Sequence, residues 1–262
     1  MDKLQVIELY DLDQRINVKY PDTRREEIPN IVRHVGSRRK SGSGTILYSR
    51  LDNGNVERTI CAQIDYFESI SQDFEWKVFD YDSPADLKDR LAAYGFEIEE
   101  AEAIMVFDLS ATPDFILQPV AHDVRQITST AKIADVMSVE RQVWNEDFAD
   151  LEAYLTHTLA SEPEKMNIYV AYVGDQPVSS AWVYFPPHSQ FASLWGGSTL
   201  PEFRGQGFYS ALLAVRVQEA ISRKVSYLTV DASPMSRPIL EKFGFEKIAD
   251  SYPCNWKCRS GK

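Results

Sequence analysis

The chain has 262 residues, 44% of them apolar, so it can bury a substantial core as one large domain or two of ordinary size. Its formal net charge is −11, and a surface of that sign repels nucleic-acid phosphates and anionic lipid. We therefore expect no nucleic-acid and no membrane partner, and a neutral or cationic small molecule fits better. Residues 1–118 carry 14 basic and 23 acidic side chains, so most of the net negative charge belongs to that part.

Targeting and metal signals are weak along the whole chain. The N-terminus MDKLQVIELYDLDQ has acidic residues where a signal peptide has a basic start, and no apolar run is long enough to span a membrane. Cys61, Cys254 and Cys258 are odd in number and lack metal-ligand spacing, as do the four histidines. These features predict a cytoplasmic protein with reduced thiols and no metal.

The first part of the chain is predicted to open with strands. TILYSR (45–50) and VERTICAQI (56–64) flank the turn LDNGN and are predicted to form a hairpin, because Asn53-Gly54 suits a tight turn. The basic run at 33–44 is interpreted as a solvated loop, with an anionic partner as the alternative. From residue 74 the pattern reads strand, Ser83-Pro84, helix, Gly95-Phe96 and strand.

The second part predicts alternating helices and strands. Periodicity and turn signals indicate, in order, a strand at 123–128, helices at 130–144 and 148–160, a hairpin of 166–173 with 178–185, a strand at 191–200, a helix at 208–224, a strand at 227–230, a short helix at 236–243 and a closing strand at 245–258. Antiparallel strands that lead into a strand, helix, strand unit imply an α/β layer fold.

The two parts also share a repeated pattern. The segment from residue 74 aligns with the segment from residue 225, with Ser83-Pro84 over Ser233-Pro234 and Gly95-Phe96 over Gly244-Phe245. Two unrelated units with common turn residues are the alternative. A duplication predicts two domains, at 1–118 and 119–262, that join in the turn-rich stretch 109–119.

The stretch TLPEFRGQGFYSALL, residues 199–213, contains the strongest candidate site. Glycines that open a helix expose its first amides, which attract phosphate with help from the helix dipole. The stretch lacks the GxxxxGK[ST] pattern of a P-loop. It also lacks the third glycine of a dinucleotide-binding fingerprint, where Ser210 stands instead. A plain tight turn remains the alternative to an anion-binding loop.

These residues resemble the R/Q-x-x-G-x-G/A signature of the GNAT superfamily of acyl-CoA-dependent N-acetyltransferases. Arg204 and Gly207 match, whereas Tyr209 stands where glycine or alanine is usual. The order of elements around the motif and the segment SPMSRPILEKFGF extend the resemblance over roughly 119–257. It implies a mixed, mainly antiparallel GNAT-like sheet flanked by helices, in two tandem copies of which the first is degenerate and lacks the glycine motif.

The resemblance implies a set of residues for acetyl-CoA, which serves as co-substrate. The backbone of Ser198, Thr199 and Leu200 would pair with the pantetheine arm as an added strand does, and Gly196-Gly197 would ease a bulge there, with a plain strand kink as the alternative. The pyrophosphate would lie on the loop and helix start, formed by Arg204, Gly205, Gln206, Gly207, Phe208, Tyr209 and Ser210. Ser233, which stands where many members carry asparagine, and Ser236 complete the cofactor-binding set. Ser236 would lie near the thioester, with a helix cap or ordinary packing as the alternative.

The catalytic acid and base are less well marked. Leu240 stands where many members carry a tyrosine acid, so the acid stays unassigned, with Tyr252 as a candidate. Glu140 and Glu146 are candidate bases, because the first two helices flank the acceptor site in this superfamily. A solvated helix carboxylate is the other interpretation of either.

The predicted function is therefore transfer of an acetyl group from acetyl-CoA to the amine of a small molecule by direct attack. A non-catalytic acyl-CoA-binding or regulatory module is the alternative, and Tyr209, Ser233 and Leu240 favour it. The acceptor and the oligomeric state are left open.

Overall fold

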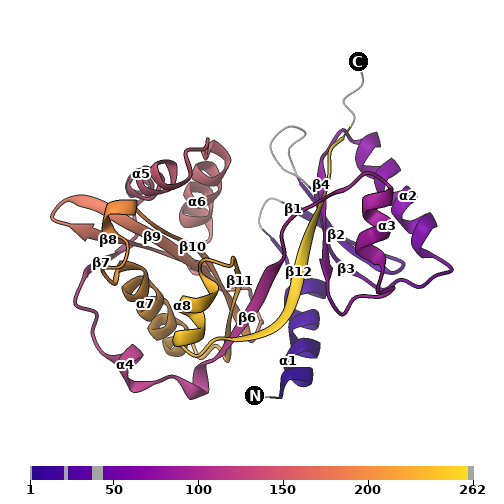
Figure 1. Cartoon of the computed structure of the whole chain (residues 1–262). Coiled ribbons are helices and arrows are strands. Elements are labelled where there is room, and N and C mark those ends of the chain that lie inside the picture. Colours follow the sequence, from indigo (N-terminus) through magenta and orange to yellow (C-terminus); the bar gives the residue numbers. More distant parts are fainter. Residues whose placement is uncertain (1, 21–22, 37–43, 259–262) are drawn as a thin grey trace. The chain divides into compact units, whose positions relative to one another are not determined.

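The computed structural model describes residues 2–20, 23–36 and 44–258 (Figure 1). Its helices are α1 (Lys3–Tyr10), α2 (Val56–Ser69), α3 (Leu87–Ala93), α4 (Asp114–Leu117), α5 (Ile133–Trp144), α6 (Ala149–Ser161), α7 (Phe208–Ser222) and α8 (Arg237–Lys242), with short turns η1 (Asp11–Ile16), η2 (Leu109–Ala111), η3 (Thr130–Lys132) and η4 (Pro201–Phe203). Its strands are β1 (Thr23–Ile28), β2 (Ile31–Gly36), β3 (Gly44–Ser49), β4 (Phe74–Phe79), β5 (Glu97–Ile98), β6 (Glu102–Asp108), β7 (Asp123–Ile127), β8 (Met166–Val173), β9 (Gln176–Tyr184), β10 (Phe191–Thr199), β11 (Tyr227–Ala232) and β12 (Glu246–Trp256).

The strands form a mixed, mainly antiparallel sheet, as the sequence predicts. The hydrogen-bonded order of the described strands is β1-β2-β3-β4-β12-β6-β11-β10-β9-β8-β7, with β5 beside β12. The strands β3 and β4 pair in parallel, as do β10 and β11. Each parallel pair is joined through one helix, α2 or α7, which is the connection that a parallel pair requires. The predicted tandem α/β fold is confirmed.

The chain divides into two compact units that do not follow one cut in the sequence. Unit 1 comprises Met1–Met105, Asp231–Lys242 and Glu246–Lys262, and unit 2 comprises Val106–Val230 and Phe243–Phe245. The last strand belongs to unit 1 because β12 pairs with β4, from Ser251↔Phe79 to Trp256↔Phe74. The contiguous division at 118 and 119 therefore differs from the compact units, and as the boundary between the two sequence copies it stays a prediction.

In unit 1, α2 corrects the predicted hairpin. The segment at 56–64 is not a strand but the start of a 14-residue helix. Val56, Ile60, Gln63 and Phe67 are its buried residues, and their spacing follows one face of a helix. The β-branched residues at 56–60 favour a strand in a short window, and only the longer window shows the helical period. The basic run at 33–44 is described only at its ends, in β2 and β3; residues 37–43 lie outside the described residues.

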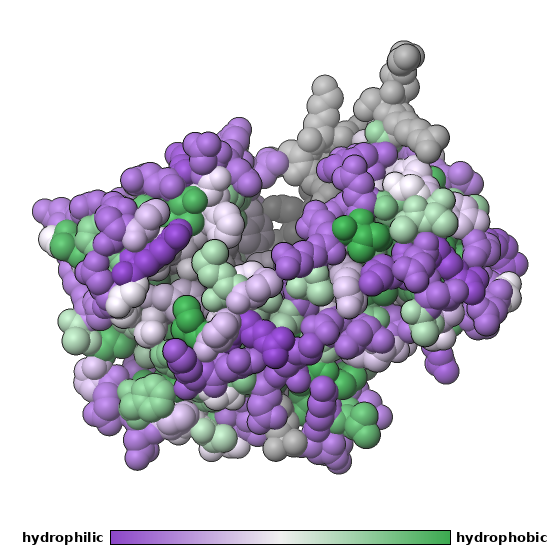
Figure 2. All heavy atoms as spheres, viewed as in Figure 1, coloured by the Kyte–Doolittle hydropathy of each residue, from purple (hydrophilic) through white to green (hydrophobic). Residues whose placement is uncertain are grey.

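Unit 2 contains a four-strand antiparallel sheet, β7 to β10, with helices on both faces (Figure 1). One face packs on α5 and α6 through an apolar cluster that includes Ile133, Met137, Leu155 and Trp182. The helix α7 contacts β8, β9 and β10 on the opposite face. In the face of the molecule shown in Figure 2, apolar residues are scattered among hydrophilic ones. None of the helices in the described ranges combines the length and apolar character that a bilayer span needs.

Candidate functional site

The candidate site begins where β10 and β11 separate. Their parallel pairing runs from Phe191↔Tyr227 to Ser193↔Thr229, although β10 continues to Thr199. Beyond this point β10 still pairs with β9, through Thr199↔Ser179. One edge of β10 is therefore without its β11 partner over its last residues, which opens a gap that an extended ligand can enter.

A β-bulge lies in this part of β10. The register with β9 shifts between Gly196 and Ser198, which makes Gly197 the extra residue. Gly196 and Gly197 have φ of +68° and +93°. A Cβ on Gly196 would lie 2.5 Å from the ring of Trp182, and one on Gly197 would lie 2.8 Å from the ring of Tyr209. The glycine pair is thus required by both backbone and packing, and the predicted bulge is confirmed.

The loop that follows leaves the N-terminus of α7 bare. Gly205 and Gly207 have φ of +71° and +89°, and a Cβ on Gly205 would have no atom within 4 Å. No side chain caps α7, so the amides of its first turn, from Phe208 to Ser210, have no partner within the helix. Those amides and the positive end of the helix dipole are suited to an anion.

The loop is held in place by neighbours that the sequence did not reveal. His122 Nε2 lies 2.9 Å from the carbonyl oxygen of Gln206. The His122 ring also packs edge-on against the Phe208 ring, with 4.5 Å between the ring centroids. Arg204 Nε donates to the carbonyl oxygen of Thr199 at 3.1 Å. Gln206 Nε2 donates to the carbonyl oxygen of Glu202 at 2.8 Å. The loop geometry is therefore set by contacts on both sides.

The backbone at 198–200 is only partly available to a ligand. The amide of Leu200 donates to the carbonyl oxygen of Val178 at 3.0 Å, so that amide already has a partner. The carbonyl oxygen of Ser198 accepts from Ser179 Oγ at 2.7 Å, and Ser179 Oγ also meets Thr199 Oγ1 at 2.7 Å. The carbonyl oxygen of Leu200 accepts from the amide of Phe203 at 2.9 Å, so both backbone groups of Leu200 already have a partner.

Glu140 lies under the bulge rather than in solvent. Its residue surface is only 3% exposed, so the expectation of a solvated helix carboxylate is wrong here. Ser180 Oγ donates to Oε1 at 2.6 Å and Ser198 Oγ donates to Oε2 at 2.7 Å. Trp144 Nε1, one helical turn along α5, donates to Ser198 Oγ at 2.9 Å. Burial raises the pKa of Glu140, and the hydrogen bonds from these side chains oppose that rise.

On the opposite face of β10, two side chains of α7 contact the bulge. Burial raises the pKa of Tyr209, whose ring lies against Gly197, and the positive charge of Arg216 opposes the rise. Arg216 is 2% exposed and donates to the carbonyl oxygens of Trp182 and Trp195, each at 3.3 Å. Burial lowers the pKa of Arg216 to about 10. Arg216 stabilises the bulge because it satisfies carbonyl oxygens where the ladder is irregular.

The remaining predicted residues are one in unit 2 and three in unit 1. Glu146 is exposed after α5. Ser233, Ser236 and Tyr252 belong to unit 1. Ser233 Oγ accepts from the amide of Ser236 at 3.3 Å, which is a capping contact ahead of α8. The Tyr252 ring packs against the unit 1 core, with Lys88 Nζ 4.1 Å from its centroid, because β12 is a strand of that unit.

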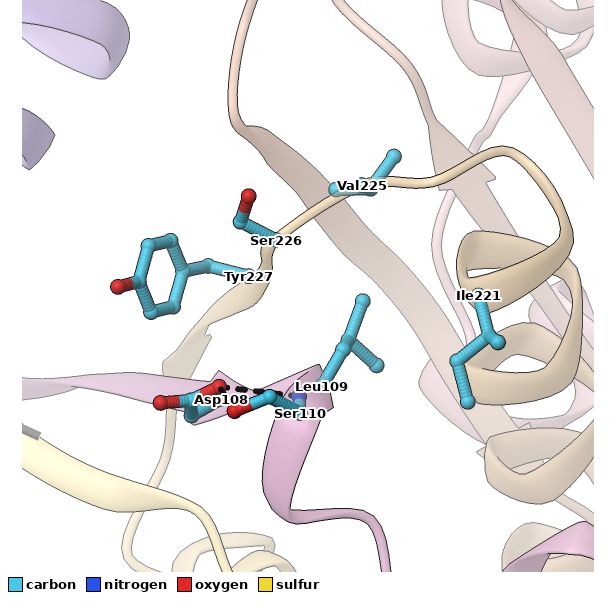
Figure 3. Close-up of a pocket in the computed structure, with 7 residues that line it drawn as sticks. All are labelled: Asp108, Leu109, Ser110, Ile221, Val225, Ser226 and Tyr227. Carbon is cyan, nitrogen blue, oxygen red and sulfur yellow. Dashed lines mark hydrogen bonds between the residues drawn. The ribbon is translucent and has the colours of Figure 1, made fainter.

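The pocket in Figure 3 is separate from this site. It has a volume of about 450 Å³ and is lined by residues that include Asp108, Ile221 and Tyr227, at the C-terminal end of α7. The bare loop precedes the other end of this 15-residue helix, roughly 20 Å away at 1.5 Å per residue. Asp108 Oδ1 already accepts from the amide and hydroxyl of Ser110. Among the described residues, no cluster of His, Cys, Asp or Glu could hold a metal ion.

A comparison with protein families identifies this region. Residues 132–245 match the model of the acetyltransferase (GNAT) family. This part of the chain is a GNAT domain. The match includes Glu140, the bulge at Gly197 and the loop before α7. The family and the fold together support acyl transfer as the type of reaction.

Solved structures extend the GNAT fold over most of the chain. A GCN5-related N-acetyltransferase from Kribbella flavida has a TM-score of 0.69 at 12% identity, covering 92% of this chain and 91% of its own. A conserved protein of unknown function from Staphylococcus epidermidis has a TM-score of 0.69 at 16% identity, covering 91% and 96%. A tandem GNAT protein from the clavulanic acid biosynthesis pathway has a TM-score of 0.62 at 12% identity, covering 94% and 87%. No curated protein sequence matches the chain.

Unit 2 contains functional candidates that the sequence did not mark. Trp144 lies four residues after Glu140, so the helical period alone puts both on one face of α5. Ser180 and His122 lie 40 and 84 residues from their hydrogen-bond partners and gave no local signal. Arginine is a residue type that is mostly exposed, yet Arg216 is buried against the sheet.

Proposed function

We propose that the protein transfers an acetyl group from acetyl-CoA to the amine of a small molecule by direct attack. The observation that carries this proposal is the continuous path from the bulged, splayed end of β10 to the uncapped N-terminus of α7. Acetyl-CoA has a thioester, a long extended arm and a pyrophosphate. The arm needs an open strand edge, and the pyrophosphate needs the free amides that follow it. The GNAT family match supports the same class of co-substrate.

In this proposal the pyrophosphate binds the amides of Phe208, Tyr209 and Ser210. Gly205 and Gly207 allow close approach because they carry no side chain, and Arg204 adds a positive charge to the loop. The pantetheine arm follows the free edge of β10 beside Ser198 and Thr199, in the manner of an added strand. The thioester then lies at the bulge, where irregular backbone can offer donors to a developing oxyanion.

The reaction needs a neutral amine whose nitrogen attacks the thioester carbonyl. The new C–N bond forms, the C–S bond breaks, and the amine loses one proton while the CoA thiolate gains one. Glu140 is the proposed acceptor of the amine proton, through the hydroxyl of Ser198, because Ser198 Oγ already donates to Glu140 Oε2 at 2.7 Å. A raised carboxyl pKa brings this base closer to the neutral operating range.

A non-catalytic acyl-CoA-binding module is the second candidate. One observation favours it: Leu240, at the position where the family tyrosine is expected, is fully buried and has no hydroxyl to protonate a thiolate. Tyr209, whose ring lies against Gly197 on the α7 side of the bulge, also carries a hydroxyl.

Thiol release from acetyl-CoA, measured against a panel of primary amines with CoA binding followed by calorimetry, distinguishes the two functions. If the protein is a transferase, it binds CoA, and its rate of thiol release rises with the concentration of at least one amine. Stoichiometric CoA binding with no release on any amine would favour the module. Absence of CoA binding would reject both.

A further inference from the structure

Two of the protein's tryptophans are exposed, and both lie beside the bulge. Trp144 is 58% exposed and Trp195 is 44% exposed, whereas Trp76, Trp182 and Trp256 are at most 6% exposed. A large aromatic side chain in water forgoes the free energy that its burial would supply. Two such rings near one candidate site therefore point to a ligand that covers them.

The two rings lie on the same face of β10. Trp195 pairs directly with Trp182, and side chains of such a pair point to one side of an antiparallel sheet. Trp182 packs in the cluster formed with Ile133 and Met137 of α5. Trp144 is the last residue of α5 and reaches Ser198 across the bulge. Both tryptophans thus lie on the α5 side of β10, opposite to Tyr209 and α7, and Trp144 is the one in contact with Ser198.

Each indole is held by a hydrogen bond. Trp144 Nε1 donates to Ser198 Oγ, and Trp195 Nε1 donates to Ser193 Oγ, both at 2.9 Å. The polar N–H of each ring is thereby used within unit 2. What each ring offers a ligand is its π-face and hydrocarbon edge, which attract apolar groups and cations and offer nothing to sugar hydroxyls.

The charges nearby favour a cation. The carboxylate of Glu140 lies one hydroxyl away from this face, and the exposed residues Glu146 and Asp147 come two and three positions after Trp144 in the sequence. An ammonium group that reaches Ser198 on this face is attracted by the π-face of Trp144 and by the carboxylate of Glu140.

We propose that Trp144 and Trp195 form the acceptor site and select a primary amine carried on an aromatic body, an arylalkylamine. This inference rests on the proposed acetyl transfer. The ammonium lies toward Ser198 and the aromatic group lies against the indoles. Aliphatic polyamines and amino sugars have no aromatic ring to stack on the indoles and are poorer acceptors.

Steady-state thiol release with phenethylamine, spermidine and glucosamine tests this selectivity. Phenethylamine has the highest kcat/KM, and Trp195→Ala raises its KM roughly tenfold with kcat nearly unchanged. Trp195→Phe retains most of the affinity because it keeps a π-face. Leu117→Ala, which truncates a 47% exposed apolar residue on α4, is the matched control and leaves KM unchanged. A preference for spermidine or glucosamine that Trp195→Ala does not alter overturns the inference and leaves acetyl transfer intact.

Binding of phenethylamine to the CoA-saturated protein, followed by calorimetry, separates the inference from the proposed function. Saturable binding that Trp195→Ala weakens, without turnover, supports the aromatic site and rejects the transferase. If phenethylamine is neither turned over nor bound, the aromatic site is rejected.

Discussion

The two parallel strand, helix, strand units of this protein differ at the start of their helices. In unit 1 the turn between β3 and α2 is LDNGN; in unit 2 the turn between β10 and α7 is LPEFRGQG. The carboxylate of Asp52 accepts from the amide of Gly54 at 2.8 Å, and its carbonyl oxygen accepts from the amides of Asn55 and Val56. In unit 1 the turn thus uses the first amide of α2, that of Val56, and sets the carboxylate of Asp52 beside it.

The strand gap also differs between the units. The parallel pairing of β3 and β4 ends at Ile46↔Trp76, much as that of β10 and β11 ends at Ser193↔Thr229. In unit 1, Arg15 fills the space beyond the last pair: its Nε donates to the carbonyl oxygen of Leu47 in β3, and its guanidinium stacks 3.9 Å from the ring centroid of Phe79 in β4. The comparison teaches that a duplicated ligand cleft can become core once its own chain occupies it.

The largest effect is expected at Glu140, the proposed general base of unit 2. Glu140→Gln lowers kcat/KM by roughly 10²–10⁴-fold, because the amide cannot accept the proton. The wild-type rate rises with pH through the raised pKa of Glu140, since the base acts when ionised, and the variant loses that limb. Glu146→Gln, at the exposed candidate, leaves the pH–rate profile unchanged; equal losses in both variants would contradict the assignment.

The same carboxyl sets a stability trend with a defined sign. Its folded-state pKa is raised, so between the ordinary carboxyl pKa and the folded value the native state binds more protons than the unfolded chain. Stability from this group is therefore lost as pH rises through that window. We expect the free energy of unfolding of Glu140→Gln, measured by denaturant at several acidic pH values, to lack this loss. If it had the same slope against pH in both proteins, burial would not raise this pKa.

The next largest effect is expected on stability, when Arg15, which fills the strand gap of unit 1, is removed. Arg15 also donates to both carboxylate oxygens of Asp82 at 2.8 Å, and both side chains are nearly fully buried. Arg15→Ala leaves that carboxylate unpaired and lowers the free energy of unfolding by about 3–5 kcal/mol, measured by urea denaturation. Arg24→Ala removes an exposed ion pair with Glu26 and costs under about 1 kcal/mol. Similar losses in both would mean that the gap is not held by Arg15.

A smaller effect is expected when unit 2 is given the charge of unit 1. Gly205→Asp adds a carboxylate beside the bare amides and weakens CoA binding roughly 10- to 100-fold by calorimetry. Aspartate and asparagine both tolerate positive φ better than most residues. Gly205→Asn therefore matches its shape without the charge and retains most of the affinity. Equal weakening by Asp and Asn would show that shape, not charge, limits the loop.

The last test concerns stoichiometry. Because the turn of unit 1 carries the Asp52 carboxylate and Arg15 fills its strand gap, one chain binds one CoA, and Gly205→Asp weakens that single binding event. Two equivalents by calorimetry on the full chain, or CoA located on residues 44–79 in a crystal soak, would contradict the contrast between the units.

The sequence alone determined the features that depend on near neighbours. The loop at 204–207, the element order from β7 to β12 and the bulge-forming pair Gly196-Gly197 all follow from turn residues and helical or strand periods within a few positions. The GNAT resemblance rested on those same residues, and the family match confirms it for 132–245.

Tertiary structure decided what depends on distant partners. Residues 56–64 suit a strand by composition, but packing of Val56, Ile60 and Phe67 on one core makes them helical. The sequence favours a surface carboxylate at Glu140, but in the structure it is buried under the bulge and accepts a hydrogen bond from Ser180, 40 residues away. Pairing of β12 with β4 puts Tyr252 in unit 1, and Arg15 fills a gap made by strands more than 25 residues later. Burial and strand partners are properties of the assembled fold, and no local window contains them.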